Sequence, residues 1–239
     1  MKPSEDEHVE LRIAVDGPAG SGKSTLARAL AETLGYMYVD TGAMYRAVAH
    51  KAFQQGLDPA RGEDQPRIIE IAAQMEFHFE WQDGEMKLHA DGEDVTDVIR
   101  TPDVERLSSP VSAIPQVREE LVAAQKALGE VGGIVMDGRD IGTVVMPDAD
   151  VKLYLVAAPE ERARRRWRQL RERGTSRPFE TVHMETVQRD QRDSSRSVSP
   201  LRPAEDAIVI DSTDMTQRDA LERALAIVEE ALRRRERGL

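Results

Sequence analysis

The stretch LRIAVDGPAGSGKST, residues 11–25, decides the fold of this chain. It opens with a short apolar run at residues 11–15, which favours a β-strand and ends abruptly at Asp16-Gly17-Pro18. Apolar residues then recur at helical spacing over residues 23–34, and Gly35 supplies a helix stop. A strand, a glycine-rich turn and a helix in this order are typical of α/β proteins with a parallel sheet.

The turn matches the phosphate-binding pattern G-x-x-x-x-G-K-[ST]. The residues that we expect to bind a nucleoside triphosphate are Gly17, Pro18, Ala19, Gly20, Ser21, Gly22, Lys23, Ser24 and Thr25. In such a loop the backbone N–H groups face one concavity, and the helix N-terminus adds positive potential there. The Lys23 ammonium can reach the β and γ phosphates, and the Ser24 hydroxyl can ligate Mg²⁺. The alternative, a chance glycine-rich turn, does not explain the flanking strand and helix.

The alternation of short strands and helices continues along the chain. Short apolar runs predict four further strands, at residues 37–39, 133–137, 151–156 and 207–211. Helical patterns cover residues 43–55, 67–74, 115–128, 159–173, 179–195 and 216–237. Residues 75–81 and 85–90 instead alternate apolar and polar around a turn at 82–84, which predicts an antiparallel hairpin. The hairpin breaks the strand–helix rhythm and indicates an insertion.

These patterns predict one α/β core interrupted by a smaller unit. We expect residues 11–67 and 108–239 to form the core and residues 68–107 to form an inserted α+β subdomain. The acidic, polar residues 1–10 are expected to be a disordered tail. No stretch has the 18 or more apolar residues of a membrane span, and no apolar leader opens the sequence. We therefore expect a soluble, cytoplasmic protein without a membrane partner.

Composition narrows the class of protein further. The chain has 239 residues, 40% of them apolar, a net charge of −11 and no cysteine. Absence of cysteine excludes a disulfide scaffold, a thiolate metal site and a cysteine nucleophile. The acidic balance and only ten aromatic residues argue against a general nucleic-acid binder.

The basic residues are unevenly distributed. Arginine supplies 27 of the 33 basic residues, and eleven arginines with five acids lie between Arg162 and Arg196. This segment carries a local charge of +6 against −17 elsewhere, which indicates a local anion site. A solvated helix face with i, i+4 ion pairs explains the charges equally well at this point.

The motifs and segments outside the phosphate-binding loop indicate which class of P-loop protein this chain belongs to. The chain lacks the guanine-reading Asn-Lys-x-Asp of GTPases, and it is too short for a motor or helicase. Transfer between two phosphorylated molecules needs charge neutralisation and exclusion of water, and a mobile arginine-bearing lid serves both. The predicted fold is a P-loop kinase core with a five-stranded parallel sheet flanked by helices, the inserted subdomain, and a helical lid at about residues 162–196.

Three further clusters carry acceptor-binding chemistry. They are DTGAMYR at residues 40–46, DGRDIGT at 137–143 and QRDQRD at 188–193, with Arg196 close behind. The second follows a buried strand, where open α/β sheets place their ligands. On one helix, Arg189, Arg192, Asp193 and Arg196 share a face, so arginines could clamp phosphates while the carboxylate takes a sugar hydroxyl.

These clusters, with DGEDV at residues 91–95 and IRT at 99–101, resemble the bacterial-type cytidylate kinases, a branch of the nucleoside monophosphate kinases. The resemblance extends from Ile13 to about Asp211. The P-loop is generic, but the remaining motifs in this order are specific. The resemblance implies that ATP and CMP or dCMP react to ADP and CDP or dCDP, with Mg²⁺, in a monomeric enzyme with no stable nucleic-acid partner.

The resemblance also implies roles for individual residues. The positions that match the family's cytosine-reading residues are Ser109, Arg118 and Asp140. Those that match its acceptor-phosphate contacts are Arg46, Arg139 and Arg196, with Thr41 and Tyr45 close to the nucleotide and Arg100 near the acceptor site. The matches to its pentose contacts are Arg189 and Asp193. The residues implied in catalysis are Lys23, Arg139 and the lid arginines Arg162 and Arg166.

Simpler interpretations stay open for some of these residues. Arg118 could be a surface arginine, and Ser108 or Ser112 could take the place of Ser109. Asp137 could assist Mg²⁺ through water or cap the following turn. For the whole chain, the alternatives are another P-loop small-molecule kinase and, in a different class, a regulatory nucleotide- or RNA-binding module using the arginine-rich segment.

Overall fold

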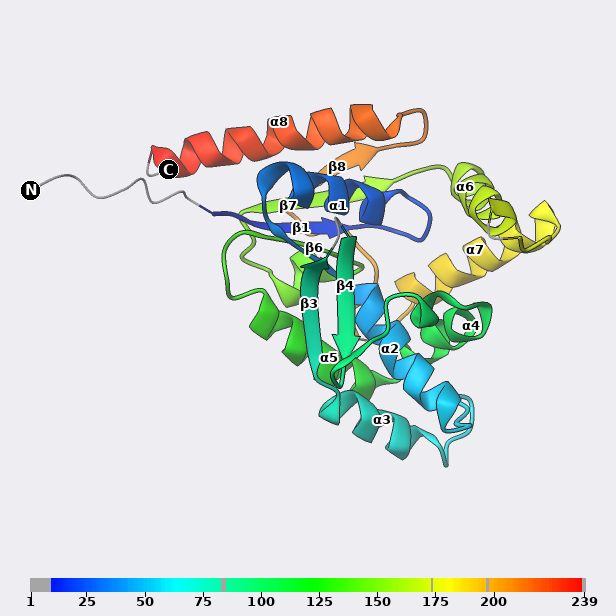
Figure 1. Ribbon diagram of the computed structural model, residues 1–239. Helices are drawn as coiled ribbons and strands as arrows, with labels where there is room; N and C mark the ends of the chain where they lie inside the picture. Colours follow the sequence, from blue (N-terminus) through cyan, green and yellow to red (C-terminus); the bar gives the residue numbers. More distant parts are fainter. Residues whose placement is uncertain (1–9, 83–84, 173, 197, 238–239) are drawn as a thin grey trace, which may run out of the picture.

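The computed structural model describes residues 10–82, 85–172, 174–196 and 198–237 (Figure 1). The predicted tail, apart from Glu10, lies outside the described residues, as do Asp83 and Gly84 of the predicted turn and Arg173 at the end of a predicted helix. Among the described residues, no helix is both long enough and apolar enough to cross a membrane.

A five-stranded parallel sheet forms the centre of the molecule, as the sequence predicts. Its strands are β2 (Met37–Asp40), β6 (Ile134–Gly138), β1 (Arg12–Asp16), β7 (Val151–Val156) and β8 (Ile208–Asp211), in that spatial order. The strand β1 pairs with β6 on one side and β7 on the other. All five carboxyl ends therefore meet at one edge, where α/β sheets bind ligands.

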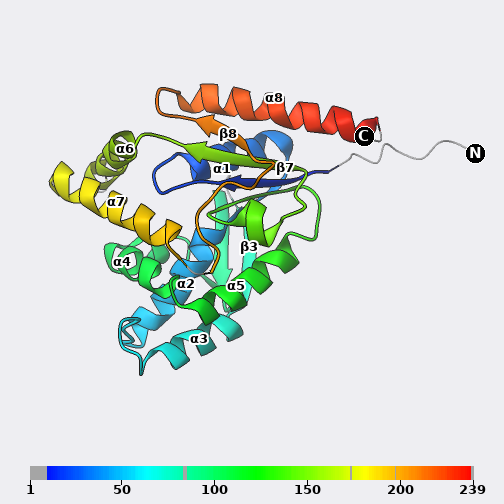
Figure 2. The same cartoon turned by 180° about the vertical axis from the view of Figure 1, so that it is seen from behind.

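Helices cover both faces of this sheet because β1 is apolar on both sides (Figures 1 and 2). Ile13 and Val15 pack in one core with α1 (Lys23–Leu34) and α8 (Gln217–Glu236). Ala14 belongs to a second core with α2 (Thr41–Gln54) and α5 (Pro115–Leu128) on the other face. A near-continuous apolar strand is what burial on both faces of a parallel sheet requires.

A small antiparallel sheet packs beside the second core. It has three strands, β3 (Phe77–Gln82), β4 (Glu85–Ala90) and β5 (Glu93–Asp94), in the order β3-β4-β5. The helix α3 (Gln65–Gln74) precedes it, and the short η1 (Val98–Arg100) and α4 (Pro102–Val111) follow. The predicted hairpin is confirmed. The sequence patterns did not indicate β5 or α4, since β5 has only two residues and α4 contains Pro110.

Two arginine-rich helices project from the same end of the sheet (Figure 2). They are α6 (Pro159–Glu172) and α7 (Phe179–Ser194), which pack together through an edge-to-face contact of Trp167 and Phe179, 6.4 Å between ring centroids. The expectation that Arg196 shares a helical face with Arg189 is wrong. The helix α7 ends at Ser194, because the chain turns at Ser195 to lead back towards β8.

Candidate active site

The glycine-rich loop between β1 and α1 adopts a backbone that its glycines make possible. Gly17, Gly20 and Gly22 all have positive φ, at 149°, 77° and 92°. A Cβ on Gly17 would lie 2.2 Å from the carbonyl oxygen of Leu155, so no other residue fits there. The loop is thus held tightly against the end of β7 and leads into the N-terminus of α1, the geometry of an anion site.

Lys23 is a buried cation at the first position of α1. Burial, followed by the positive charge of Arg139, lowers the pKa of Lys23 to about 7, although Asp137 acts in the opposite direction. Arg189 adds further repulsion. In turn, burial and Arg139 lower the pKa of Arg189 to about 10. Cations brought together at this cost in free energy are stabilised by an anion between them, and phosphate groups supply several negative charges.

The side chains of Ser24 and Asp137, close to Lys23, carry oxygen atoms that fit a magnesium ion. The Ser24 hydroxyl donates a hydrogen bond to Oδ2 of Asp137 at 2.7 Å, and the Tyr38 hydroxyl donates to Oδ1 at 2.9 Å. Mg²⁺ binds hard oxygen ligands, usually one or two from protein together with phosphates and water. Among the described residues, no three His, Cys, Asp or Glu side chains cluster as a metal site. The Ser24 hydroxyl and the Asp137 carboxylate are oxygen donors of the kind that Mg²⁺ prefers.

Arg139 joins the loop to the arginine-rich helices. Its Nη1 donates to the carbonyl oxygen of Gly17 at 3.0 Å, and its Nε donates to Asp193 at 3.0 Å. Asp193 also accepts from Arg196 at 2.5 Å and lies 4.0 Å from Nε of Arg189. Burial would raise the pKa of Asp193, but these three arginines outweigh it and hold that pKa below its usual value. Two of the predicted phosphate residues, Arg139 and Arg196, thus meet the predicted pentose residue Arg189 around one buried carboxylate.

A cavity of about 440 Å³ opens next to this cluster. Its lining residues are Ser109, Pro110, Ala113, Pro115, Arg118, Arg192, Ser195, Arg196 and Val198. The volume lies within the usual range for small-molecule sites, about 300–1,000 Å³. The cavity lies between α4, α5 and the segment after α7, so the helix that the sequence patterns did not indicate forms one wall of it.

One lining residue of the cavity, Arg118, belongs to a buried ion pair. Arg118 on α5 donates to Asp140 at 2.5 Å, and their side chains are only 3% and 6% exposed. The Arg118 guanidinium also lies over the Tyr45 ring, 5.3 Å from its centroid. Arg118 is therefore not a surface arginine, so that alternative is excluded. Of the neighbouring serines, Ser109 lines the cavity, whereas Ser112 accepts a hydrogen bond from Arg196 at 3.1 Å.

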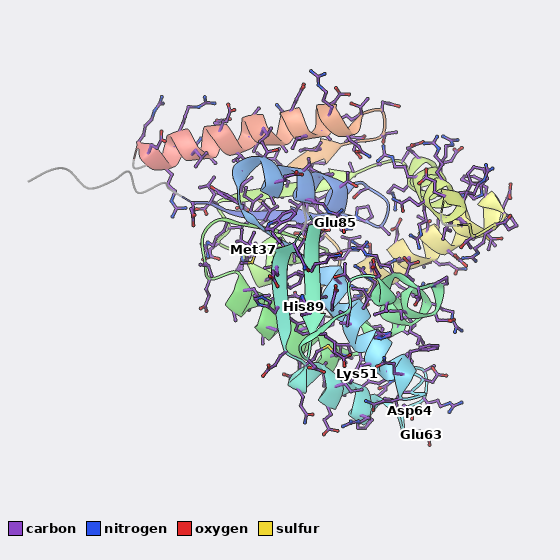
Figure 3. The ribbon with its side chains drawn as sticks, in the orientation of Figure 1. Met37, Lys51, Glu63, Asp64, Glu85 and His89 are labelled. Carbon is purple, nitrogen blue, oxygen red and sulfur yellow. The ribbon has the colours of Figure 1, made fainter. Side chains whose placement is uncertain are left out.

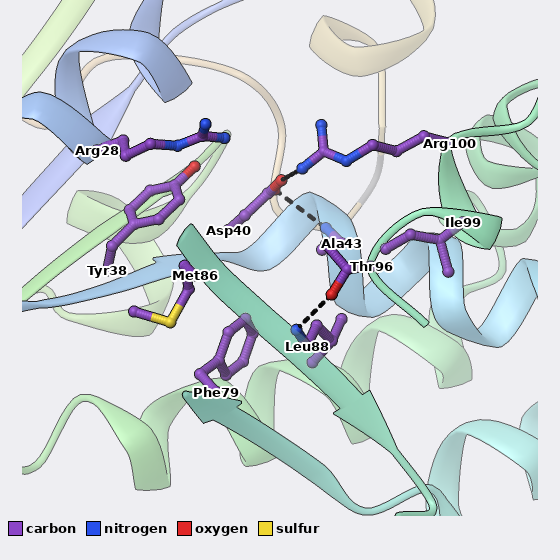
Figure 4. A pocket seen from close by; sticks show the side chains of 10 residues that line it. All are labelled: Arg28, Tyr38, Asp40, Ala43, Phe79, Met86, Leu88, Thr96, Ile99 and Arg100. Carbon is purple, nitrogen blue, oxygen red and sulfur yellow. Dashed lines mark hydrogen bonds and ion pairs between the residues drawn. The ribbon is translucent and has the colours of Figure 1, made fainter. Parts of the chain in front are cut away.

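The other predicted acceptor residues lie at the N-terminus of α2. Arg46 donates to Asp40 at 2.7 Å, and Arg100 lies 4.0 Å from the same carboxylate oxygen. Figure 4 shows Asp40 between the Arg28 and Arg100 side chains, with its carboxylate capping α2 at Ala43. The Thr41 hydroxyl donates to the carbonyl oxygen of Asp137 at 2.8 Å, which ties this end of α2 to β6.

The two predicted lid arginines are both engaged with protein groups. Arg162 is 4% exposed, donates to the carbonyl oxygen of Ala19 at 3.1 Å and pairs with Asp190 at 2.6 Å. Arg166 pairs with Glu105 on α4. Arg162 thus contacts the back of the phosphate-binding loop, and Arg166 links α6 to a wall of the cavity.

Several polar atoms around the cluster have no hydrogen-bond partner among the described residues. The predicted site residues among them contribute the Ser21 and Tyr45 hydroxyls and the Nε atoms of Arg46, Arg118, Arg189 and Arg196. Buried polar atoms are normally hydrogen-bonded, so these atoms are candidates to bond with water or with a bound ligand.

Sequence reasoning assigned no site role to Tyr38 or Asp16 and considered Ser112 only as a replacement for Ser109, yet all three hold the site together. Tyr38 binds Asp137, Ser112 binds Arg196, and Asp16 accepts from the backbone after Asp140. A usable signal existed only for Asp16, an acid at the end of an otherwise apolar strand. The contacts of Tyr38 and Ser112 span 99 and 84 residues, and no local pattern encodes them.

Comparison with known proteins now identifies the family. The family model for cytidylate kinase matches residues 13–230. A cytidylate kinase of Caldanaerobacter subterraneus is 47% identical over 97% of this chain and 98% of its own length. One from Pelotomaculum thermopropionicum is 50% identical over 85% and 89%. A solved structure of a shikimate kinase from Bacteroides thetaiotaomicron aligns with 92% of this chain and 99% of that chain, at 11% identity and a TM-score of 0.48. From the family match and the curated relatives, the chain belongs to the cytidylate kinase family.

Proposed function

We propose that this protein transfers the γ-phosphoryl group of ATP directly to CMP or dCMP. The observation that carries the proposal is the position of Arg139. Its guanidinium donates both to the P-loop at Gly17 and to Asp193 beside the 440 Å³ cavity, so it spans a donor site and an acceptor site. An arginine between two phosphorylated ligands neutralises the charge that otherwise keeps them apart.

Cytosine recognition is assigned to Asp140, Arg118 and Ser109. A carboxylate can accept a hydrogen bond from the 4-amino group of cytosine, and a guanidinium can donate to O2 and N3. Uracil would turn a carbonyl oxygen towards the carboxylate of Asp140, and the resulting repulsion discriminates against it. The burial of the Arg118–Asp140 pair strengthens both effects, because little water screens them.

The acceptor phosphate is assigned to Arg46, Arg139 and Arg196, with Arg100, Thr41 and Tyr45 nearby, and the pentose to Arg189 and Asp193. In the free protein Arg46 is paired with Asp40, and both Arg139 and Arg196 with Asp193. These carboxylates keep the arginines ordered until a phosphate brings stronger acceptors. The Nε atoms of Arg46 and Arg196 are buried without a hydrogen-bond partner among the described residues, and that phosphate would supply one.

The chemistry needs no nucleophile from the protein, because the acceptor phosphate is itself an anion. Lys23 and the P-loop amides of residues 17–25 would bind and orient the ATP phosphates, and Arg139 would stabilise the transferring group. Ser24, with Asp137 beside it, would hold Mg²⁺, which supplies charge neutralisation between the phosphates. Arg162 and Arg166 on α6 would close over the donor and exclude water.

The organisation of the chain is part of the same proposal. We assign monophosphate binding to the subdomain at residues 68–107 and lid motion to residues 162–196. The protein is proposed to act as a cytoplasmic monomer with small-molecule substrates only. The acidic charge outside the lid, −17 in total, supports the absence of a polyanion partner.

A panel of nucleoside monophosphates tests the proposed function. With ATP and Mg²⁺, CMP and dCMP should exceed UMP, AMP and GMP in kcat/KM by about tenfold or more, since only cytosine satisfies both Asp140 and Arg118. A coupled ADP-release assay measures each rate. The assignment would be overturned if any other monophosphate exceeded CMP about tenfold. Salt-dependent RNA binding without monophosphate-dependent turnover would favour the RNA-binding alternative.

The lowered pKa of Lys23 predicts proton uptake on ATP binding. Above pH 7 the free protein holds Lys23 mostly neutral, and bound phosphate favours its charged form. At pH 8 we expect uptake of about 0.5–1 proton per ATP bound, and progressively weaker ATP binding as the pH rises above 7. Calorimetric titrations in buffers of different ionisation enthalpy measure the uptake. A Lys23→Met variant should abolish it, and equal uptake by both proteins would exclude Lys23 as its source.

A further inference from the structure

Asp16 is a buried acid that lies next to the ATP-binding loop. Its side chain, however, contacts the segment that is proposed to bind the acceptor nucleotide. It is the last residue of β1 and directly precedes the P-loop, with 4% of its surface exposed. Its Oδ1 accepts a hydrogen bond from the N–H of Ile141 at 2.8 Å, and its Oδ2 accepts from the N–H of Gly142 at 2.7 Å. Both N–H groups belong to the turn that follows Arg139 and Asp140.

This turn is a single π-helical turn, η2 (Ile141–Val145). The first N–H groups of any helix lack partners within the helix, and Ile141 and Gly142 are both buried. The carboxylate of Asp16 satisfies two of these groups at once. The carbonyl oxygen of Asp140 accepts from Val144 and Val145 at 2.9 and 3.2 Å, so the backbone of Asp140 is part of the same turn.

Only a carboxylate can make both contacts. Its two oxygens are acceptors, whereas an asparagine would offer one acceptor and turn an N–H₂ group towards the other N–H. The acid is kept here although burial, the largest influence, raises the pKa of Asp16 to about 7 against the effect of the two N–H groups. The two oxygens of this carboxylate are each matched to one backbone N–H at the start of η2.

A second contact joins the same two segments. Arg139 donates to the carbonyl oxygen of Gly17, the residue after Asp16, at 3.0 Å. The end of β1 and the turn after β6, its parallel neighbour, are therefore joined by two side-chain contacts. Asp16 reaches from the strand to the turn, and Arg139 reaches from the turn to the end of the strand. Movement of η2 relative to β1 would displace Asp140 from Arg118 and Arg139 from Asp193.

We infer that Asp16 is a positioning residue for the acceptor nucleotide: it fixes η2 and thereby the Arg139 and Asp140 side chains, although it borders the ATP-binding loop. The inference rests on the proposed CMP kinase function. It predicts that a change at Asp16 acts mainly on the acceptor, because the P-loop retains its own glycines, Lys23 and the helix N-terminus.

The test is Asp16→Asn, with separate KM values for CMP and ATP. We expect the KM for CMP to rise about 10- to 100-fold and the CMP-over-UMP preference to fall, with the KM for ATP changed less than about threefold. The matched control is Asp64→Asn. Asp64 also accepts from a backbone N–H, that of Asp58 at 2.9 Å, but lies at the far end of α3 (Figure 3). A purely structural role would lower thermal stability without changing base preference.

A second variant approaches the contact from the other side. In Gly142→Ala the new Cβ would lie 3.2 Å from Cδ of Lys152, which is tight, and 3.4 Å from Oδ2 of Asp16, an ordinary contact distance, so it alters the packing around the contact mainly through Lys152 while the carboxylate stays. We expect an increase of about three- to tenfold in the KM for CMP alone.

The outcomes separate this inference from the proposed function. Wild-type protein that fails to phosphorylate CMP overturns the function. The role of Asp16 is overturned if the wild type is active and Asp16→Asn loses ATP affinity as much as CMP affinity. It is also overturned if the variant of an active enzyme loses neither affinity. If Asp16→Asn does not fold, an unchanged KM for CMP in Gly142→Ala overturns it instead.

Discussion

Replacing Lys23 with alanine should lower kcat by about 10²- to 10³-fold, the range expected when one preorganised electrostatic group is removed from a phosphoryl-transfer site. Lys23 lies 8% exposed at the N-terminus of α1, where the P-loop concentrates backbone N–H groups. Its charge would act on phosphate oxygens that become more negative as transfer proceeds. The loss should therefore appear in kcat more than in the KM for CMP.

The same substitution should not weaken the free protein. Burial and Arg139 already make the Lys23 cation unfavourable in the absence of ligand, as its lowered pKa indicates. Removing it relieves repulsion, so the melting temperature without ATP should stay the same or rise, and the rise caused by ATP should shrink. Thermal denaturation with and without ATP measures both effects. An activity loss caused by unfolding would instead lower the melting temperature of the free protein.

The matched control is Lys51→Ala. Lys51 lies on α2 with its side chain 40% exposed, and it pairs with Asp91 at 3.4 Å (Figure 3). An exposed ion pair of this kind contributes about 0–1 kcal/mol, so kcat and stability should both stay near wild type. A Lys23→Ala enzyme that kept kcat within about threefold of wild type would contradict the assigned role, because one lost phosphate contact costs far more.

The parallel core could be predicted because its signals are local. Each strand is a short apolar run, and α1 and α5 have the bounds that their apolar spacing and flanking residues predict. The elements that could not be predicted are stabilised by distant contacts. The strand β5 exists because Glu93 and Asp94 pair with β4, and α4 packs on α2 and η1 with Pro110 in its last turn.

The candidate site divides in the same way. The P-loop and the clusters at residues 40–46 and 137–143 follow strand ends, so the topology of the sheet brings them together. The ion pairs could not be predicted: Arg118–Asp140 spans 22 residues, and Arg139–Asp193 spans 54. Charge composition alone did not decide whether the arginine-rich segment forms an anion site or a solvated helix face. Arg164 pairs with Glu160 and Glu161 on an exposed face, whereas Arg162 is buried against the P-loop, so both descriptions hold for different residues.

Substitution of Asp140 should change which base is accepted. In Asp140→Ala the 4-amino group of cytosine loses its acceptor, and Arg118 loses the carboxylate 2.5 Å away. One well-placed base contact is worth about 1–3 kcal/mol, so we expect the CMP-over-UMP ratio of kcat/KM to fall about 5- to 150-fold. The Kd for ATP should change little, because the Asp140 carboxylate pairs with Arg118 on α5 and not with a residue of the P-loop.

Loss of the buried pair will also affect folding, so the two effects must be separated. Removing one partner of such a pair costs about 3–5 kcal/mol, since it leaves a buried charge alone. Asp140→Asn keeps the shape and an acceptor for Arg118, and its amide can donate to O4 of uracil. We therefore expect Asp140→Asn to fold better than Asp140→Ala and to favour UMP relative to wild type.

The control for these variants is Asp103→Ala on α4, which removes an exposed carboxylate 3.3 Å from Arg106 without touching the cavity. Its base preference should equal that of wild type. Steady-state rates with CMP and UMP, together with ATP titrations, measure all three variants. If Asp140→Asn and Asp140→Ala kept the wild-type preference, or lost ATP affinity as strongly as CMP turnover, Asp140 would not be the residue that reads the base. Only a change of preference without loss of ATP binding agrees with a carboxylate that faces cytosine.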